Sequence, residues 1–152
     1  MIQHNIIVVL MLPGFDENGN LPPGVHEAIW SEFVEHFGAT DHRRQLLRGL
    51  KSALDSLKAA GCKRVYIDGS LVTDKVAPND FDGCWEAEGV NPEQLDPILL
   101  DFSAGRAAQK AKYLGEFFIA DTRVLEVGRT FLEFFQQDKE TGAPKGIIAI
   151  DL

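Results

Sequence analysis

Segments with helical periodicity alternate with short β-branched and aromatic runs along this chain of 152 residues. Such alternation predicts helices packed against one mixed β-sheet, which is an α/β or α+β fold. No composition change or linker marks a domain boundary, so residues 1–152 are expected to form one domain. The expected strands are residues 6–12, 63–69, 80–88, 115–124 and 145–152.

The first expected helix is indicated by apolar residues at a spacing of four. Val25, Ile29, Phe33 and Phe37 would form one stripe, which Gly38 would end. This pattern predicts a helix that begins near Val25.

The second expected helix begins after Thr40, a residue type that caps helix N-termini, and ends at Gly61. Its apolar stripe consists of Leu46, Leu47, Leu50, Leu54 and Leu57. Further helical segments are expected from Asn91-Pro92, from Ser103 and over residues 129–137, where the phenylalanines are predicted to be core residues.

The composition restricts the possible partners and the compartment. A net charge of −8 argues against broad nucleic-acid binding, while a small anionic ligand held locally with metal ions remains open. Cys62 and Cys84 are expected to be buried reduced thiols of a cytoplasmic protein, in preference to a disulfide or a zinc site. The apolar residues 5–13 are too few to span a bilayer and lack signal-peptide features, so no membrane association is expected.

The stretch "YIDGSLVTDKVAPNDFDGCW" (residues 66–85) contains two acids one residue apart. In a strand, Asp80 and Asp82 would project from the same face while Phe81 turns to the core. Two close carboxylates repel each other unless a cation lies between them. Mg²⁺ suits such oxygen ligands and leaves positions for substrate phosphates.

Gly69 and Ser70 end the strand that precedes these acids. They offer a position without a Cβ, a hydroxyl group and free backbone N–H groups, and a helix beginning there would favour a phosphate. Gly-Ser and Asp-x-Asp are each common alone, and Pro78 to Asp80 could be an ordinary turn. Their combination on two successive strands, about ten residues apart, is more informative.

This combination resembles the signature of the nucleotidyltransferase superfamily, the DNA polymerase beta-like fold. The resemblance implies a minimal nucleotidyltransferase fold, phosphate binding by Gly69 and Ser70, and two Mg²⁺ ions held by Asp80 and Asp82. The segments "LPPGVHEAIW", "GRAAQKAKY" and "PKGIIAIDL" also resemble a minimal bacterial nucleotidyltransferase-like family of unknown function.

The superfamily uses a third carboxylate on a neighbouring strand. Glu116, at the start of an expected strand, has a separation from Asp80 similar to that in the family and is favoured as the third catalytic and metal-binding acid. Asp101, which has the right apolar surroundings, is the alternative ligand, and Asp121 is the third candidate.

Basic residues near the motif are candidates for nucleotide binding in so acidic a chain. Lys75 lies between Gly-Ser and Asp-x-Asp, and Arg106 and Lys110 are four residues apart on one expected helix. A triphosphate needs such partners, although each of these residues taken singly also fits an ordinary solvated surface.

The resemblance implies a Mg²⁺-dependent nucleotidyltransferase that moves a nucleoside monophosphate from a nucleoside triphosphate to a hydroxyl of a protein, an RNA or a small molecule. A protein partner or a homo-oligomer is expected to complete the site, and minimal members often belong to bacterial toxin–antitoxin or defence pairs. The alternatives are a non-catalytic binding module of the same fold, such as an antitoxin-like partner protein, and an unrelated α/β domain with an accidental motif.

Overall fold

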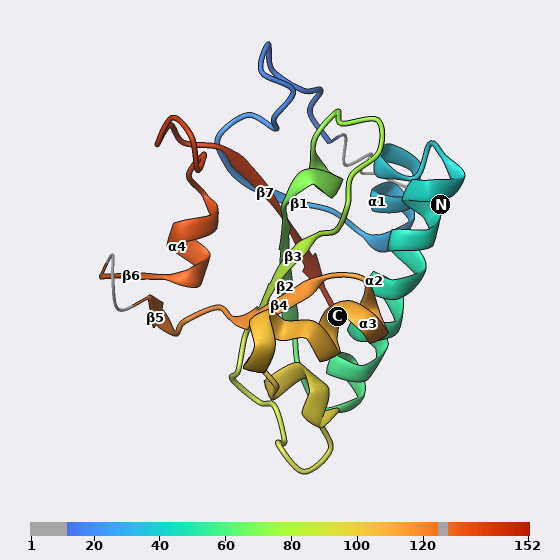
Figure 1. The fold of residues 1–152 in the computed structure, drawn as a ribbon, viewed down its shortest axis with the longest axis vertical. Helices are drawn as coiled ribbons and strands as arrows, with labels where there is room; N and C mark the ends of the chain where they lie inside the picture. Colours follow the sequence, from blue (N-terminus) through green and yellow to red (C-terminus); the bar gives the residue numbers. More distant parts are fainter. Residues whose placement is uncertain (1–11, 125–127) are drawn as a thin grey trace, which may run out of the picture.

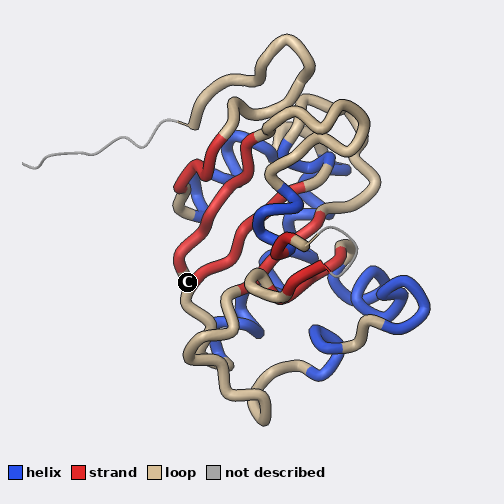
Figure 2. Tube along the Cα trace, turned by 90° about the vertical axis from the view of Figure 1, so that its left-hand side faces the viewer, coloured by secondary structure: helices blue, strands red, loops and turns tan. Residues whose placement is uncertain are grey.

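A five-stranded mixed sheet forms the centre of the computed structural model, which describes residues 12–124 and 128–152 (Figure 1). Its strand order is β1-β7-β2-β3-β4, and β5 and β6 form a separate two-stranded ribbon. The strands, drawn in red in Figure 2, are β1 (Gly24–Glu27), β2 (Arg64–Asp68), β3 (Asp82–Trp85), β4 (Glu116–Ile119), β5 (Arg123–Val124), β6 (Arg129–Thr130) and β7 (Gly146–Asp151). The fold is therefore α+β with a mixed sheet packed by helices, as the sequence predicts.

Helices lie on both faces of the sheet, but unequally (Figure 1). The α-helices are α1 (Trp30–Phe37), α2 (Asp41–Ala59), α3 (Ala107–Tyr113) and α4 (Phe131–Phe135), and the 3₁₀ helices are η1 (Ser70–Val72), η2 (Pro97–Leu100) and η3 (Ser103–Arg106). The first three α-helices cover one face, and α4 alone lies against the other (Figure 1).

The alternation of side chains along β2 separates two apolar cores. Val65 and Ile67 pack in the large core under α1 and α2, whereas Tyr66 packs with Cys84 and Phe118 on the α4 side. Because successive side chains of a strand point to opposite faces, Asp68 belongs to the same face as Tyr66. The end of β2 therefore places an acid on the sparsely covered face.

Helix α2 follows its sequence pattern closely. The Thr40 side chain accepts a hydrogen bond from the Arg43 backbone N–H at 3.1 Å, and Gly61, with a φ of +99°, follows the helix end. All five leucines of its stripe are buried.

The helix expected from Val25 begins only at Trp30, because Gly24–Glu27 forms the edge strand β1. This strand pairs in parallel with β7, with Val25 opposite Ile147. Val25 and Ile29 are 39% and 57% exposed, so neither belongs to the apolar face of α1. Gly24 pairs with Gly146, more than 120 residues later in the chain. This strand pairing overrides the helical spacing of Val25 and Ile29.

Asn91-Pro92 begins a turn instead of the expected helix, with the Asn91 carboxamide oxygen accepting from the Glu93 N–H at 3.0 Å. The helical turn comes later, at η2, where the Asp96 side chain accepts from the Ile98 N–H and Pro97 occupies the first position. The same capping chemistry is used, five residues further along the chain.

Two expected strands are shorter than predicted: residues 80–88 give only β3, and residues 115–124 give β4 and β5. The strand expected over residues 6–12 falls, apart from Leu12, outside the described residues, and Leu12 itself is not in a strand. Cys62 and Cys84 are buried free thiols, as expected. Of the helices in the described ranges, none is long and apolar enough to cross a membrane.

Candidate active site

Three acids lie at paired positions on three adjacent strands. Asp68 on β2 is opposite Asp82 on β3, and Asp82 is opposite Glu116 on β4. Directly paired residues point to the same face of a sheet, so the three side chains form one row on the α4 side. We call Asp68, Asp82 and Glu116 the acid row.

Gly69 allows the chain to pass close to the central acid of the row. Its φ is +87°, which disfavours any residue with a Cβ. A Cβ at this position would also lie 3.0 Å from the Asp82 backbone N and 3.2 Å from its carboxylate Oδ2. The glycine therefore lets the Asp82 carboxylate lie against the turn that follows β2.

Ser70 follows this glycine and ties the turn to the other acid of the motif. Its hydroxyl group donates to the backbone carbonyl oxygen of Asp80 at 3.3 Å. The helix that begins at this point is only the three-residue η1, so no helix of greater length supports a phosphate here. A single 3₁₀ turn aligns too few peptide dipoles for that role.

Asp80 precedes β3 instead of lying within it, and Phe81 between the two acids is completely buried. The Phe81 ring packs edge-on against Phe117 with centroids 5.5 Å apart, and it occupies the space that a side chain at position 115 would need, where the chain has Gly115. Phe81 thus anchors the acid motif to the core.

Burial and neighbouring negative charges make Asp82 hard to ionise. Burial, with the charge of Asp68 and smaller effects of Glu116 and Asp80, raises the pKa of Asp82 to about 7, against the opposing charge of Lys139. Burial and the charge of Glu116 also raise the pKa of Asp80. Neither carboxylate accepts a hydrogen bond from the part of the chain that the structure describes.

The outer acids of the row are paired with cations. Lys145 Nζ lies 3.0 Å from Asp68 Oδ1, and both side chains are largely buried. Burial nevertheless raises the pKa of Asp68, against the charge of this lysine. Glu116 is held by Lys110 at 2.6 Å and by Arg106, whose Nε is 3.3 Å away.

The basic candidates from the sequence occupy different places around the acids. Arg106 and Lys110 both contact Glu116, although Arg106 precedes α3 with a φ of +62° and is not part of the helix. The exposed Lys75 lies in the loop before Asp80, and its charge lowers the pKa of that acid. Lys139 acts in the same direction on Asp68, Asp80 and Asp82.

A buried arginine holds the loop that joins Ser70 to Asp80. The guanidinium group of Arg43, on α2, donates to the carbonyl oxygens of Leu71 at 2.7 Å and Thr73 at 2.8 Å, and also to that of Lys75. Helix α2 therefore helps to fix the path of this loop.

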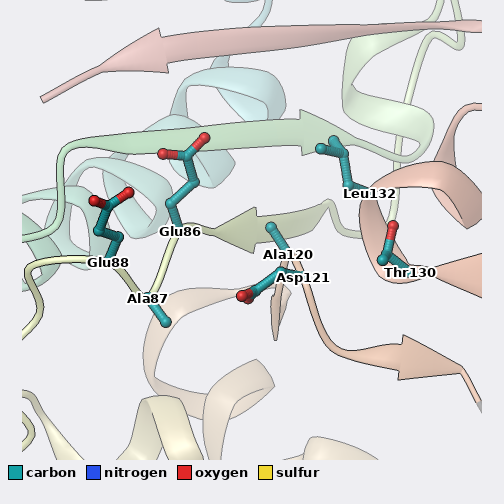
Figure 3. A pocket seen from close by; sticks show the side chains of 7 residues that line it. All are labelled: Glu86, Ala87, Glu88, Ala120, Asp121, Thr130 and Leu132. Atoms are coloured by element: carbon teal, nitrogen blue, oxygen red, sulfur yellow. The ribbon is translucent and has the colours of Figure 1, made fainter.

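The two other candidates for a third acid lie away from the row. Asp101 follows the end of η2 and is therefore on no strand of the sheet. Its carboxylate accepts hydrogen bonds from the backbone N–H and the hydroxyl group of Ser103. Asp121 follows the far end of β4 and lines a cavity of about 320 Å³ beyond the end of β3 (Figure 3). The other residues around this cavity are Glu86, Ala87, Glu88, Ala120, Thr130 and Leu132.

Three residues beside the motif were not singled out from the sequence. Asp68 reads as the polar end of a strand, and only its pairing with Asp82 brings it into the row. Lys139 and Lys145 lie far along the chain, and their approach depends on the central position of β7. The sequence does contain a signal for Asp68, because this acid directly precedes the Gly-Ser pair. In a strand its side chain would lie on the same face as that of Tyr66.

The donor set fits Mg²⁺ only in part. Among the described residues, no group of three or more His, Cys, Asp or Glu side chains is placed to hold a metal ion. Asp80 and Asp82 carry carboxylates without hydrogen-bond partners in that part of the chain, which suits an ion bound by one or two carboxylates and by phosphates. Glu116 fits as a third ligand only when Lys110 and Arg106 release it.

The fold and these residues define an α+β protein with an acid row beside a Gly-Ser turn. Residues 13–151 match the Family of unknown function (DUF6932), and the chain belongs to this family. No curated protein and no solved structure matches the chain significantly.

Proposed function

We propose that the chain is a Mg²⁺-dependent nucleotidyltransferase that moves a nucleoside monophosphate from a nucleoside triphosphate to an acceptor hydroxyl. The observation that carries this proposal is the register of Asp82 with Glu116, directly beside the Gly69-Ser70 turn. It gathers carboxylates from two strands and a turn that begins with a glycine at one end of the sheet.

Each group has a role that follows from its place. Asp80 and Asp82, with Glu116, would hold Mg²⁺, which neutralises phosphate charge and activates the attacking hydroxyl. Lys110 and Arg106 neutralise Glu116 in the structure and would turn to the phosphates when that acid takes up the metal. Gly69 and Ser70 would contact the triphosphate through backbone N–H groups and the hydroxyl.

The pairing of the outer acids favours a second candidate, a non-catalytic binding module of the same fold. Glu116 contacts two cations and Asp68 contacts Lys145, so these carboxylates already have counter-ions within the chain. An antitoxin-like partner protein could keep this arrangement without binding metal.

On the catalytic proposal, the chain works in the bacterial cytoplasm, and a protein partner or a second copy completes the acceptor site. The buried free thiols Cys62 and Cys84 support a reducing compartment. The acceptor is a protein, an RNA or a small molecule, and the chain would be one member of a toxin–antitoxin or defence pair.

The decisive experiment is incubation with each α-labelled nucleoside triphosphate, Mg²⁺ and bacterial extract. We expect label transfer to one class of acceptor, lost in Asp82→Asn and retained in Asp101→Asn, which removes an acid outside the row. Nucleotide binding by calorimetry runs in parallel. A protein that neither binds Mg²⁺-nucleotide nor transfers label would be assigned to the binding-module class.

A further inference from the structure

A second cavity, of about 210 Å³, lies beside the acid row. It includes Phe118, which is two residues after Glu116 on β4 and therefore on the same face of the sheet. Its lining residues are Phe102, Arg106, Phe118, Ile119, Thr122 and Phe131.

The walls of this cavity, which we call the aromatic pocket, are mainly flat rings. The Phe118 and Phe131 rings have centroids 4.6 Å apart and are tilted by 32°. Phe102 also lines the cavity, and its side chain is 42% exposed, so a ligand from solvent can reach this ring. The polar side chains of the lining are those of Arg106 and Thr122.

Arg106 connects the aromatic pocket to the acid row. Its guanidinium carbon lies 4.7 Å from the centre of the Phe118 ring, and its Nε is 3.3 Å from a carboxylate oxygen of Glu116. That Nε is buried, yet it makes no hydrogen bond of acceptable geometry within the described ranges. The Arg106 guanidinium group thus lies between an acid of the row and the ring of Phe118.

We propose that the aromatic pocket binds the base of the nucleoside triphosphate, an inference that rests on the proposed function. A base offers a flat π-face to phenylalanine rings and to a guanidinium plane, and both kinds of stacking are favourable. Its phosphates would then extend past Arg106 towards Asp82. Since the lining offers only two polar side chains, the pocket recognises the shape of a planar ring more than the edge of a particular base.

The test compares ligands with and without a base. Binding of Mg²⁺-ATP, Mg²⁺-GTP and Mg²⁺-tripolyphosphate is measured by calorimetry for the wild type and Phe102→Ala. We expect Phe102→Ala to weaken nucleotide binding by about 5- to 150-fold, the range for loss of one stacking partner, and to leave tripolyphosphate binding unchanged. Phe102→Trp keeps a stacking ring and should retain nucleotide binding.

Leu100→Ala is the matched control, because Leu100 is 41% exposed, lies two residues away and does not line the pocket. It should change neither affinity. Equal affinities of wild type and Phe102→Ala for nucleotides would overturn the inference, as would an equal loss for nucleotides and tripolyphosphate.

Adenosine and guanosine, measured by ligand-observed NMR, separate this inference from the proposed function. Nucleoside binding that depends on Phe102, together with no tripolyphosphate binding and no effect of Asp82→Asn, would keep the aromatic pocket and refute the nucleotidyltransferase proposal. A wild-type protein that binds neither nucleosides nor nucleotides would refute both.

Discussion

Asp82 is an acid of the row whose ionised form is disfavoured by its surroundings. It lies between Asp68 and Glu116 on neighbouring strands, and those two acids have cations while Asp82 has none at contact distance among the described residues. Burial and the Asp68 charge therefore keep its proton bound until about pH 7. The ion pairs of the described residues provide no cation for this protonated, buried carboxyl group.

Asp82→Asn should stabilise the metal-free protein, and more at pH 8 than at pH 5. The folded state releases the Asp82 proton near pH 7 and the unfolded chain near 3.8, so the wild type loses stability as the pH rises between these values. Asparagine removes that loss, and we expect a gain on the order of 1–3 kcal/mol at pH 8 that shrinks towards pH 4. Urea unfolding in EDTA at several pH values measures it.

The control for this prediction is Asp121→Asn, which removes an exposed acid at the far end of β4. A gain for Asp82→Asn that is the same at pH 5 and pH 8 would show that the acid is not buried beside other negative charges.

Lys145→Met should destabilise the protein by about 2–4 kcal/mol, because it leaves Asp68 buried without its cation. Adding Asp68→Asn should recover part of that loss, since the uncompensated charge is then removed. A double-mutant cycle from denaturant unfolding measures the coupling. Additive effects would mean that the 3.0 Å pair contributes nothing specific.

Strand periodicity explains only part of the site. The sequence predicts Asp80 and Asp82 on one strand, but only Asp82 is in β3. It also favours Glu116 over Asp101 as the third acid, and the structure places Glu116 on the strand beside Asp82. Lys145 could not be named, because its contact with Asp68 depends on a strand pairing that no local pattern encodes.

At the scale of elements, α2 does more than cover the sheet. Its first turn carries Arg43, whose guanidinium group donates to one carbonyl oxygen of η1 and to two of the loop between η1 and β3. That loop leads directly to Asp80, so the N-terminus of α2 determines where the acid motif begins. The apolar stripe of α2 was predictable, whereas this use of a charged residue on its buried side was not.

Arg43→Met should cost about 2–4 kcal/mol, because buried carbonyl oxygens lose their donors. The amides of residues 71–77 should exchange their hydrogens faster than those of β2, which a mass-spectrometric exchange experiment resolves. Arg44→Met is the control: Arg44 pairs with Asp41 on the surface, and its loss should stay within about 0.5 kcal/mol. Similar effects of the two substitutions would argue against the role of Arg43.

Sequence patterns misplaced one element that depends on a distant partner and one whose cap comes later in the chain. Val25 belongs to a four-residue edge strand that needs β7, and Asn91-Pro92 imitates the cap that Asp96-Pro97 provides. Long amphipathic α2 needed no such partner, and its limits were predictable from Thr40 and Gly61.

At the scale of the whole molecule, the charge distribution couples ligand binding to stability. The chain carries a net charge of −8, but several lysines act on the acids of the site. If the proposed function holds, Mg²⁺ and a nucleoside triphosphate together should raise the melting temperature more than either does alone. At a hundredfold excess over the dissociation constant the gain is about 2.7 kcal/mol, or roughly 5–10 °C.

Differential scanning calorimetry of a Mg²⁺-nucleotide titration measures this gain. Asp82→Asn should melt at the same temperature with and without ligand, whereas Asp101→Asn should respond as the wild type does. An identical response of Asp82→Asn and wild type would place any nucleotide binding elsewhere in the protein.

The place of β7 in the sheet has a consequence for synthesis on the ribosome. It is the last of the five strands to emerge, yet it lies between β1 and β2. Until residues 146–151 have emerged, β1 has no strand to pair with, and the edge of β2 that β7 will cover has no partner. Open edges of this kind invite pairing with other chains, so a nascent chain stalled before β7 is exposed to aggregation and to capture by chaperones.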